Sequence, residues 1–253
     1  MKGCSVVNYT YHVLLTGEQR DFEALQKTLL PGLGSVDERD GHKYLHSRAY
    51  EQLGSSAEVR RQAALLIDAF NIGRELNSGV KSKITVAGVS RTLPDGREIA
   101  ELELTPITAR SSMFATFATM EEQTEAVRHV VELALREQSV RDTIRCFTRD
   151  RDRYDLRKVF ELIRADVCAR GGMQNLQDNQ QLISAKLCTF DEIDDFEEGV
   201  NNPAVSSLDD ARHAAYQRPN KHRYANRLPQ PMTLYQAQDF IEQLLQRWLA
   251  AKS

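Results

Sequence analysis

The chain lacks the sequence signatures that usually assign an enzymatic function directly. None of the motifs G-x-x-x-x-G-K-[ST], G-x-G-x-x-G after a strand, G-x-S-x-G and H-E-x-x-H occurs in its 253 residues. Their absence removes the usual evidence for nucleotide hydrolysis, dinucleotide redox chemistry, α/β-hydrolase chemistry and zinc-dependent proteolysis. We therefore expect no cofactor.

Cysteines and long apolar runs are also scarce. The cysteines lie far apart without a C-x-x-C pair, so we expect reduced core thiols and no metal site: Cys4, Cys146, Cys168 and Cys188. No run reaches the ~18–20 apolar residues that a membrane span needs. The N-terminus also lacks the apolar segment typical of a secretory signal. We therefore expect a cytoplasmic protein without membrane association.

The composition is that of an ordinary globular protein. Hydrophobic residues make up 41% and charged residues 27% of the chain, which argues against global disorder. The net charge of −3 and the isoelectric point near 6.1 provide no overall attraction to nucleic acid. A chain of this length can bury one large core or two modest ones.

Strand and helix patterns alternate over the first 118 residues. Residues 9–15 place apolar side chains at every second position, which predicts a strand. An S-x-x-E capping box at Ser55 opens an apolar stripe with helical spacing. Residues 84–90 and 99–104 flank a P-D-G turn and predict a hairpin. We therefore predict a mixed strand and helix part over residues 1–118.

From residue 119 onward the pattern is helical. Apolar residues recur at helical spacing in five stretches: 127–135, 139–147, 156–167, 193–200 and 234–249. The last stretch is the clearest, because Thr233 and Gln236 form a T-x-x-Q capping box before it. The expected fold class is α+β, with a mixed part over residues 1–118 and a mostly α-helical module over residues 119–253.

Ionisable residues gather in the polar segment before the last helix. Asp209, Asp210, Arg212 and His213 follow one another closely, and His222 lies downstream. A histidine beside an arginine suits a metal-independent ribonuclease, because the imidazole moves a proton and the guanidinium holds the phosphate. Arg212, His213 and His222 are therefore the candidate catalytic residues. The alternative is a structural cluster that ties an irregular segment to its neighbours.

A basic run follows this cluster. Together with Asp209 and Asp210, the candidate binding residues are Arg218, Lys221, Arg223, Tyr224 and Arg227. Cations for phosphates and aromatic rings for base stacking are typical of single-stranded nucleic-acid binding, which makes RNA a candidate partner. Prolines in the same segment predict a loop, so a solvated connector is the alternative. The charge-dense stretch 149–158 is interpreted as a helix start with alternating salt bridges.

The last half of the chain resembles an uncharacterised bacterial family ending in N-N-x3-S-x4-A-R-H and then P-M-x4-A-x3-I-x2-L-x3-W-L. The matching residues are Asn201, Asn202, Ser206, Ala211, Arg212, His213, Pro231, Met232, Ala237, Ile241, Leu244, Trp248 and Leu249. The module also loosely resembles the HEPN helical family, which includes RNases of toxin and antiphage systems with R-x(4–6)-H on a helix. This chain differs, since Arg218 and His222 are spaced R-x3-H and Arg212 directly precedes His213. The resemblance implies a helical fold.

These observations support two hypotheses of different classes. The leading one is a cytoplasmic bacterial binding or accessory protein in a defence or stress system. Its helical module would associate with a protein partner or with a second copy of the chain. The alternative is a metal-independent, HEPN-like RNase that uses the Arg212–His213 cluster.

Overall fold

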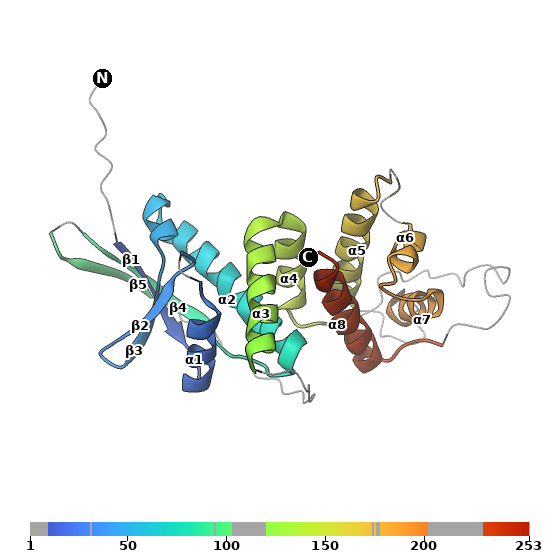
Figure 1. Cartoon of the computed structure of the whole chain (residues 1–253), viewed down its shortest axis with the longest axis horizontal. Coiled ribbons are helices and arrows are strands. Elements are labelled where there is room, and N and C mark those ends of the chain that lie inside the picture. Colours follow the sequence, from blue (N-terminus) through green and yellow to red (C-terminus); the bar gives the residue numbers. More distant parts are fainter. Residues whose placement is uncertain are drawn as a thin grey trace, which may run out of the picture. The chain divides into compact units, whose positions relative to one another are not determined.

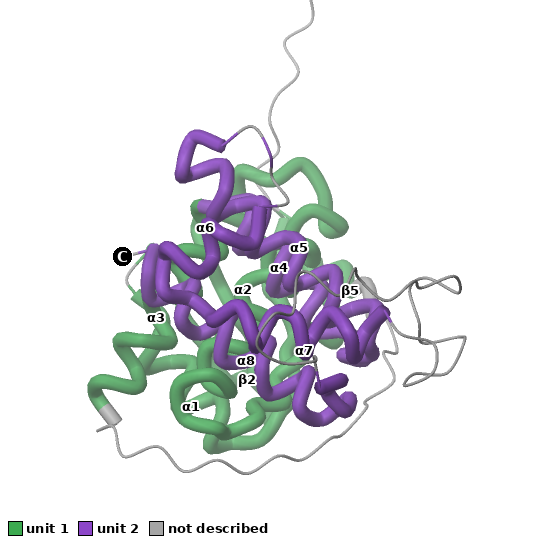
Figure 2. The backbone as a smooth tube through the Cα atoms, turned by 90° about the vertical axis from the view of Figure 1, so that its right-hand side faces the viewer, with its two compact units in different colours: residues 1–136 green, residues 137–253 purple. Residues whose placement is uncertain are grey.

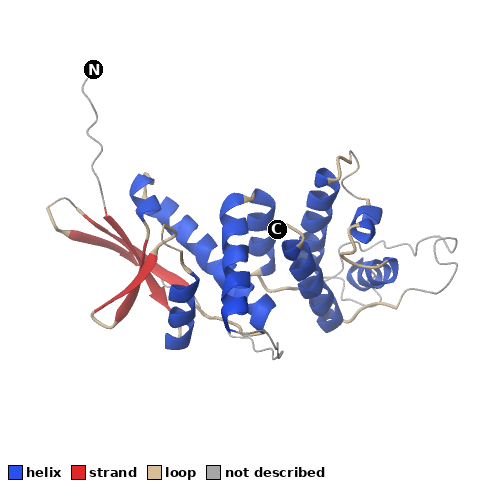
Figure 3. Cartoon of the chain, in the orientation of Figure 1, coloured by secondary structure: helices blue, strands red, loops and turns tan. Residues whose placement is uncertain are grey.

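The structure is a computed structural model that describes most of the chain (Figure 1). The described residues are 10–30, 32–93, 95–102, 120–173, 175, 178–201 and 230–252. The chain divides into two compact units, residues 1–136 and residues 137–253 (Figure 2). In their described parts, the first unit combines strands with helices and the second contains helices alone (Figure 3). The predicted α+β fold class is confirmed.

The first unit contains a five-stranded antiparallel sheet with the order β2-β3-β1-β4-β5. The strands are β1 (Thr10–Thr16), β2 (Ser35–Arg39), β3 (His42–His46), β4 (Thr85–Thr92) and β5 (Glu98–Leu102). Tyr11, Val13 and Leu15 of β1 are buried, as the alternating pattern predicts. The helices of this unit lie on one side of the sheet (Figure 3). The alternate residues of β1, His12 and Leu14, therefore face the opposite side of the sheet.

Among its described residues, the first unit also has three α-helices and one 3-10 helix. They are α1 (Gln19–Thr28), the 3-10 helix η1 (Arg48–Gln52), α2 (Ser56–Ser78) and α3 (Met120–Arg136). The predicted capping box is present, since the Ser55 hydroxyl accepts a hydrogen bond from the Glu58 backbone N–H. Gly73 allows α2 and α3 to pack closely, because a Cβ there would lie 3.1 Å from Val127 Cγ1. Helix α3 thus lies in the first compact unit. The predicted helical module over residues 119–253 stays a prediction.

The second unit is arranged around α5. The helices in its described part are α4 (Gln138–Phe147), α5 (Arg153–Arg170), α6 (Asn179–Ser184), α7 (Phe190–Asn201) and α8 (Leu234–Ala250). Phe160, Phe196 and Phe240 join α5, α7 and α8, with ring centroids 5.2–6.4 Å apart. Such aromatic pairs add about 1 kcal/mol each beyond their burial. Among the described residues, no helix has the length and apolar character required to cross a membrane.

Candidate functional site

The site residues predicted from the sequence fall in the segment 202–229, outside the described residues. They are Asp209, Asp210, Arg212, His213, Arg218, Lys221, His222, Arg223, Tyr224 and Arg227. Their roles in RNA cleavage or binding stay predictions. The structure does describe the chain on both sides of this segment.

The two flanks of the segment 202–229 are held together by one arginine. Arg153 is buried at the start of α5, and its Nη1 donates hydrogen bonds to Gly199 O (2.5 Å) and Met232 O (3.2 Å). Asp195 adds two contacts, because its carbonyl accepts from Met232 N (3.2 Å) and its carboxylate accepts from Gln230 N (2.6 Å). We call Asp195, Gly199, Gln230, Met232 and Arg153 the stem. The stem fixes where the chain leaves α7 and where it returns before α8.

Beside the stem, α7 and α8 border a hollow of about 430 Å³, here called the α7–α8 hollow. Its lining includes the carboxylates of Glu192, Asp195 and Asp239, and no lysine or arginine among the described residues. The Gln243 side-chain amide donates to Asp239, and the Thr189 backbone N–H donates to Glu192. These hydrogen bonds hold the Asp239 and Glu192 carboxylates in place. The hollow therefore favours a cationic group.

An exposed aromatic side chain stands at this hollow. Tyr235, in the first turn of α8, is 67% exposed, and its neighbour Leu234 is 39% exposed. Phe240 lines the same hollow from a buried position. An accessible tyrosine beside a buried aromatic ring is typical of protein-binding surfaces, where tyrosine contributes large contact area at low entropic cost. The arrangement can therefore bind an apolar or cationic side chain.

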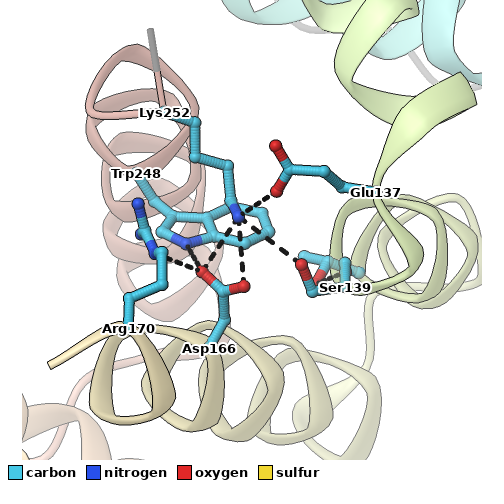
Figure 4. Close-up of polar contacts among 7 residues, drawn as sticks. Glu137, Ser139, Asp166, Arg170, Trp248 and Lys252 are labelled. Atoms are coloured by element: carbon cyan, nitrogen blue, oxygen red, sulfur yellow. Dashed lines mark hydrogen bonds and ion pairs between the residues drawn. The ribbon is translucent and has the colours of Figure 1, made fainter. Parts of the chain in front are cut away.

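A second polar cluster surrounds Lys252 after the end of α8 (Figure 4). The Lys252 side chain is only 2% exposed, and its Nζ donates to Glu137 Oε2 (2.6 Å) and Asp166 Oδ1 (3.1 Å). Trp248 Nε1 donates to the other Asp166 oxygen at 2.9 Å. Burial alone raises the pKa of Asp166, but hydrogen bonds from Ser139, Lys252 and Trp248 outweigh it and hold that pKa below its usual value. Each charge faces an opposite one, so this cluster stabilises the fold.

A row of polar side chains from four strands crosses the sheet in the first unit. His12 Nδ1 lies 2.9 Å from His46 Nδ1, and His12 Nε2 lies 3.1 Å from Thr92 Oγ1. His46 Nε2 lies 3.3 Å from Asp37 Oδ2. With neutral rings, one proton assignment satisfies both hydrogen bonds: Thr92 donates to His12, and His12 donates to His46. The remaining proton of His46 then lies on Nε2, which faces Asp37 without making a hydrogen bond to it. The two hydrogen bonds therefore run in one direction, from Thr92 through His12 to His46.

Burial and neighbouring charges shift the pKa of both histidines. Burial is the largest cause that lowers the pKa of both rings. Arg39 lowers the pKa of His12 further, and His12 lowers that of His46, while the Asp37 carboxylate opposes both effects. Because both Nδ1 atoms share one hydrogen bond, protonation of both rings would break it. The described residues contain no group of three or more His, Cys, Asp and Glu residues suited to a metal ion.

These features define an α+β protein with a helical second unit and an acidic hollow bordered by an exposed tyrosine. No protein-family model, curated protein or solved structure matches the chain. Functional inference therefore depends on the geometry of the described residues.

Two residues that the structure places in these clusters, Arg153 and His12, are not among the site residues predicted from the sequence. Arg153 lies in the charge-dense stretch interpreted as a helix start with salt bridges, and Asp152 does cap α5 by accepting from Asp155 N. The Arg153 guanidinium instead contacts backbone carbonyls far along the chain. The position of His12 could have been predicted, because it alternates with Tyr11 and Val13 along the strand and so lies on the other face of β1.

Proposed function

We propose that the chain is a binding protein whose second unit engages a protein partner through Tyr235 and the α7–α8 hollow. The observation that carries this proposal is the 67% exposure of Tyr235 beside a hollow lined by the buried Phe240. Burial of an exposed tyrosine ring in a partner complex yields a large hydrophobic gain and leaves the phenol group free to hydrogen-bond at the rim.

The chemistry of the hollow suggests the kind of partner. Its acidic side chains favour a lysine or arginine, whose aliphatic part could rest on the Tyr235 ring while its charge meets Asp239 or Glu192. A segment with a basic residue next to an apolar one fits both features. Such a segment belongs either to another protein or to a second copy of this chain.

The wider setting of the proposal depends on the sequence resemblance alone. That resemblance supports a cytoplasmic, HEPN-like accessory protein in a bacterial defence or stress system. The alternative function is a metal-independent RNase with Arg212, His213 and His222 as its catalytic residues. It is supported by the adjacency of an arginine and a histidine within a segment whose flanks Arg153 holds.

The partner-binding proposal is tested with Tyr235→Ala and the matched control Tyr154→Ala, which removes another exposed tyrosine of the same unit. Tagged proteins are used to recover partners from cells that naturally produce the chain, and sedimentation velocity of the pure proteins measures self-association. We expect a specific partner, or a dimer, with wild type and Tyr154→Ala but not with Tyr235→Ala. Equal recovery by all three proteins would refute the proposed site.

The RNase alternative is tested in parallel by incubating RNA with the pure protein in EDTA. Cleavage that disappears in His213→Ala, with an unchanged melting temperature, would establish the RNase instead. Intact RNA after incubation with folded wild-type protein would exclude it.

A further inference from the structure

A positively charged cleft lies among three helices of the first unit, α1, α2 and α3. Its volume is about 290 Å³. Arg20 and Lys27 of α1 and Arg74 of α2 line it, against the single carboxylate of Glu23. Ser78 and Thr124 add hydroxyl groups to the lining. The described lining thus carries an excess of positive charge, although the whole chain has a net charge of −3.

Arg74 is the unusual member of this lining. Its side chain is only 18% exposed, and its guanidinium makes no hydrogen bond to any described residue. The nearest carboxylate oxygen, Asp21 Oδ1, is 3.9 Å from Arg74 Nη2, which is too far for a hydrogen bond. A guanidinium has five N–H donors, and none of the Arg74 nitrogens is among the buried atoms that lack a partner, so these donors remain accessible from the cleft. The cleft therefore presents strong donors that suit an oxygen-rich anion.

The surroundings of Arg74 have an electrostatic consequence. Burial lowers its pKa, the Asp21 carboxylate partly opposes this effect, and Arg20 adds to it. An anion next to the guanidinium would remove the repulsion between the two arginines. It would also supply the hydrogen-bond acceptors that the Asp21 carboxylate is too distant to provide.

The walls of the cleft are held by contacts between helices. Arg128 of α3 donates from Nε to Thr28 O (3.3 Å) and from Nη2 to Lys27 O (3.2 Å), which ties α3 to the last turn of α1. Ser78 donates to the Arg74 carbonyl at 2.7 Å and so holds the last turn of α2. Fixed walls lower the entropic cost of binding a small ligand.

We propose that this cleft binds the phosphate group of a compact anion, with Arg74 as its bidentate anchor and Arg20 and Lys27 as flanking charges. The planar guanidinium fork matches two phosphate oxygens, and a doubly charged group needs more than one cation. The volume is at the lower end of the range for small-molecule sites, which favours a compact ligand. The site lies in the first unit and is independent of the partner-binding proposal.

The test is isothermal titration calorimetry of the full chain with inorganic phosphate at constant ionic strength, with sodium chloride as the blank titrant. We expect saturable binding at one site. Arg20→Ala and Lys27→Ala should each weaken binding roughly fivefold, as loss of an exposed charge partner allows. Arg74→Lys keeps the charge beside Asp21 but removes the fork, and it should weaken binding at least ~10-fold while the protein stays folded.

The matched control is Arg61→Ala, because Arg61 is an exposed arginine of the same helix that does not line the cleft. Its affinity for phosphate should equal that of wild type. A second titrant, glycerol phosphate, separates the sources of the phosphate group: tighter binding than inorganic phosphate supports a small phosphorylated molecule, and equal or weaker binding supports free phosphate. No saturable binding by folded wild type, or undiminished binding by folded Arg74→Lys, would overturn the proposal.

Discussion

Gly199 lies against the backbone of Met232 so closely that a Cβ at residue 199 would be 2.6 Å from the Met232 oxygen and 2.9 Å from its nitrogen. This approach joins the last turn of α7 to the residues that lead into α8. A side chain at residue 199 has no space without moving backbone atoms. Glycine is therefore required here by packing, and the stem depends on it.

Gly199→Ala should lower the free energy of unfolding by about 2 kcal/mol, because the added methyl group must push Met232 away and loosen its hydrogen bond to Arg153. Urea denaturation followed by circular dichroism measures this change. The matched control is Gly171→Ala in the same unit, whose Cβ would lie 3.1 Å from the end of the Gln181 side chain and no closer than 3.5 Å to any backbone atom. An unchanged unfolding midpoint for Gly199→Ala would contradict the account of the stem.

Lys252→Ala should destabilise the second unit by about 1.5–3 kcal/mol, because Asp166 keeps Arg170 and Trp248 but loses its buried cation (Figure 4). Thermal and urea unfolding both report this loss. Lys158→Ala, which removes an exposed lysine of α5, serves as the control and should change stability by less than about 0.5 kcal/mol. Equal effects of the two variants would show that the Lys252 cluster contributes little.

The His12–His46 pair should make the protein less stable in mild acid. Both pKa values are lowered from 6.5 in the folded state, so below that pH the unfolded chain takes up protons that the folded chain does not. The stability that the neutral pair contributes is present above pH 6.5 and is lost as the pH falls through the folded pKa values. Melting temperatures measured from neutral to mildly acidic pH should therefore decline.

The double variant His12→Gln/His46→Gln should flatten this decline, since it removes both titrating groups. His42→Gln changes an exposed histidine of β3, the strand that contains His46. Its melting temperature should vary with pH as that of wild type does. If the double variant and wild type respond to pH alike, the pair does not control stability in this range.

Local sequence patterns predicted the helices and strands. The polar clusters instead depend on contacts between residues far apart in the sequence. The T-x-x-Q box lies within four residues, and the structure confirms both of its hydrogen bonds between Thr233 and Gln236. The contact between His12 and His46 instead depends on the register of β1 with β3, which no local pattern encodes. Arg153 is a similar case, because its acceptors Gly199 and Met232 become neighbours only when α5, α7 and α8 pack together.

The candidate site residues also differ in whether the sequence alone could identify them. The sequence indicated a candidate site in the segment 202–229, because a cluster of ionisable residues can be recognised without knowledge of the fold. Tyr235 belongs to the polar face of an amphipathic helix, where a single aromatic residue is unremarkable in sequence. Its exposure at the hollow lined by Phe240 and Asp239 becomes apparent only once α7 and α8 are packed.

The most direct test of the proposed function is site-specific photo-crosslinking in living cells. A benzophenone amino acid is placed at residue 235 in one protein and, as the control, at residue 154 in another. We predict a discrete covalent adduct from residue 235, identified by mass spectrometry as one protein or as a second copy of this chain, and none from residue 154. No adduct at residue 235, or the same adducts at both positions, would contradict the claim that Tyr235 and the α7–α8 hollow bind a partner.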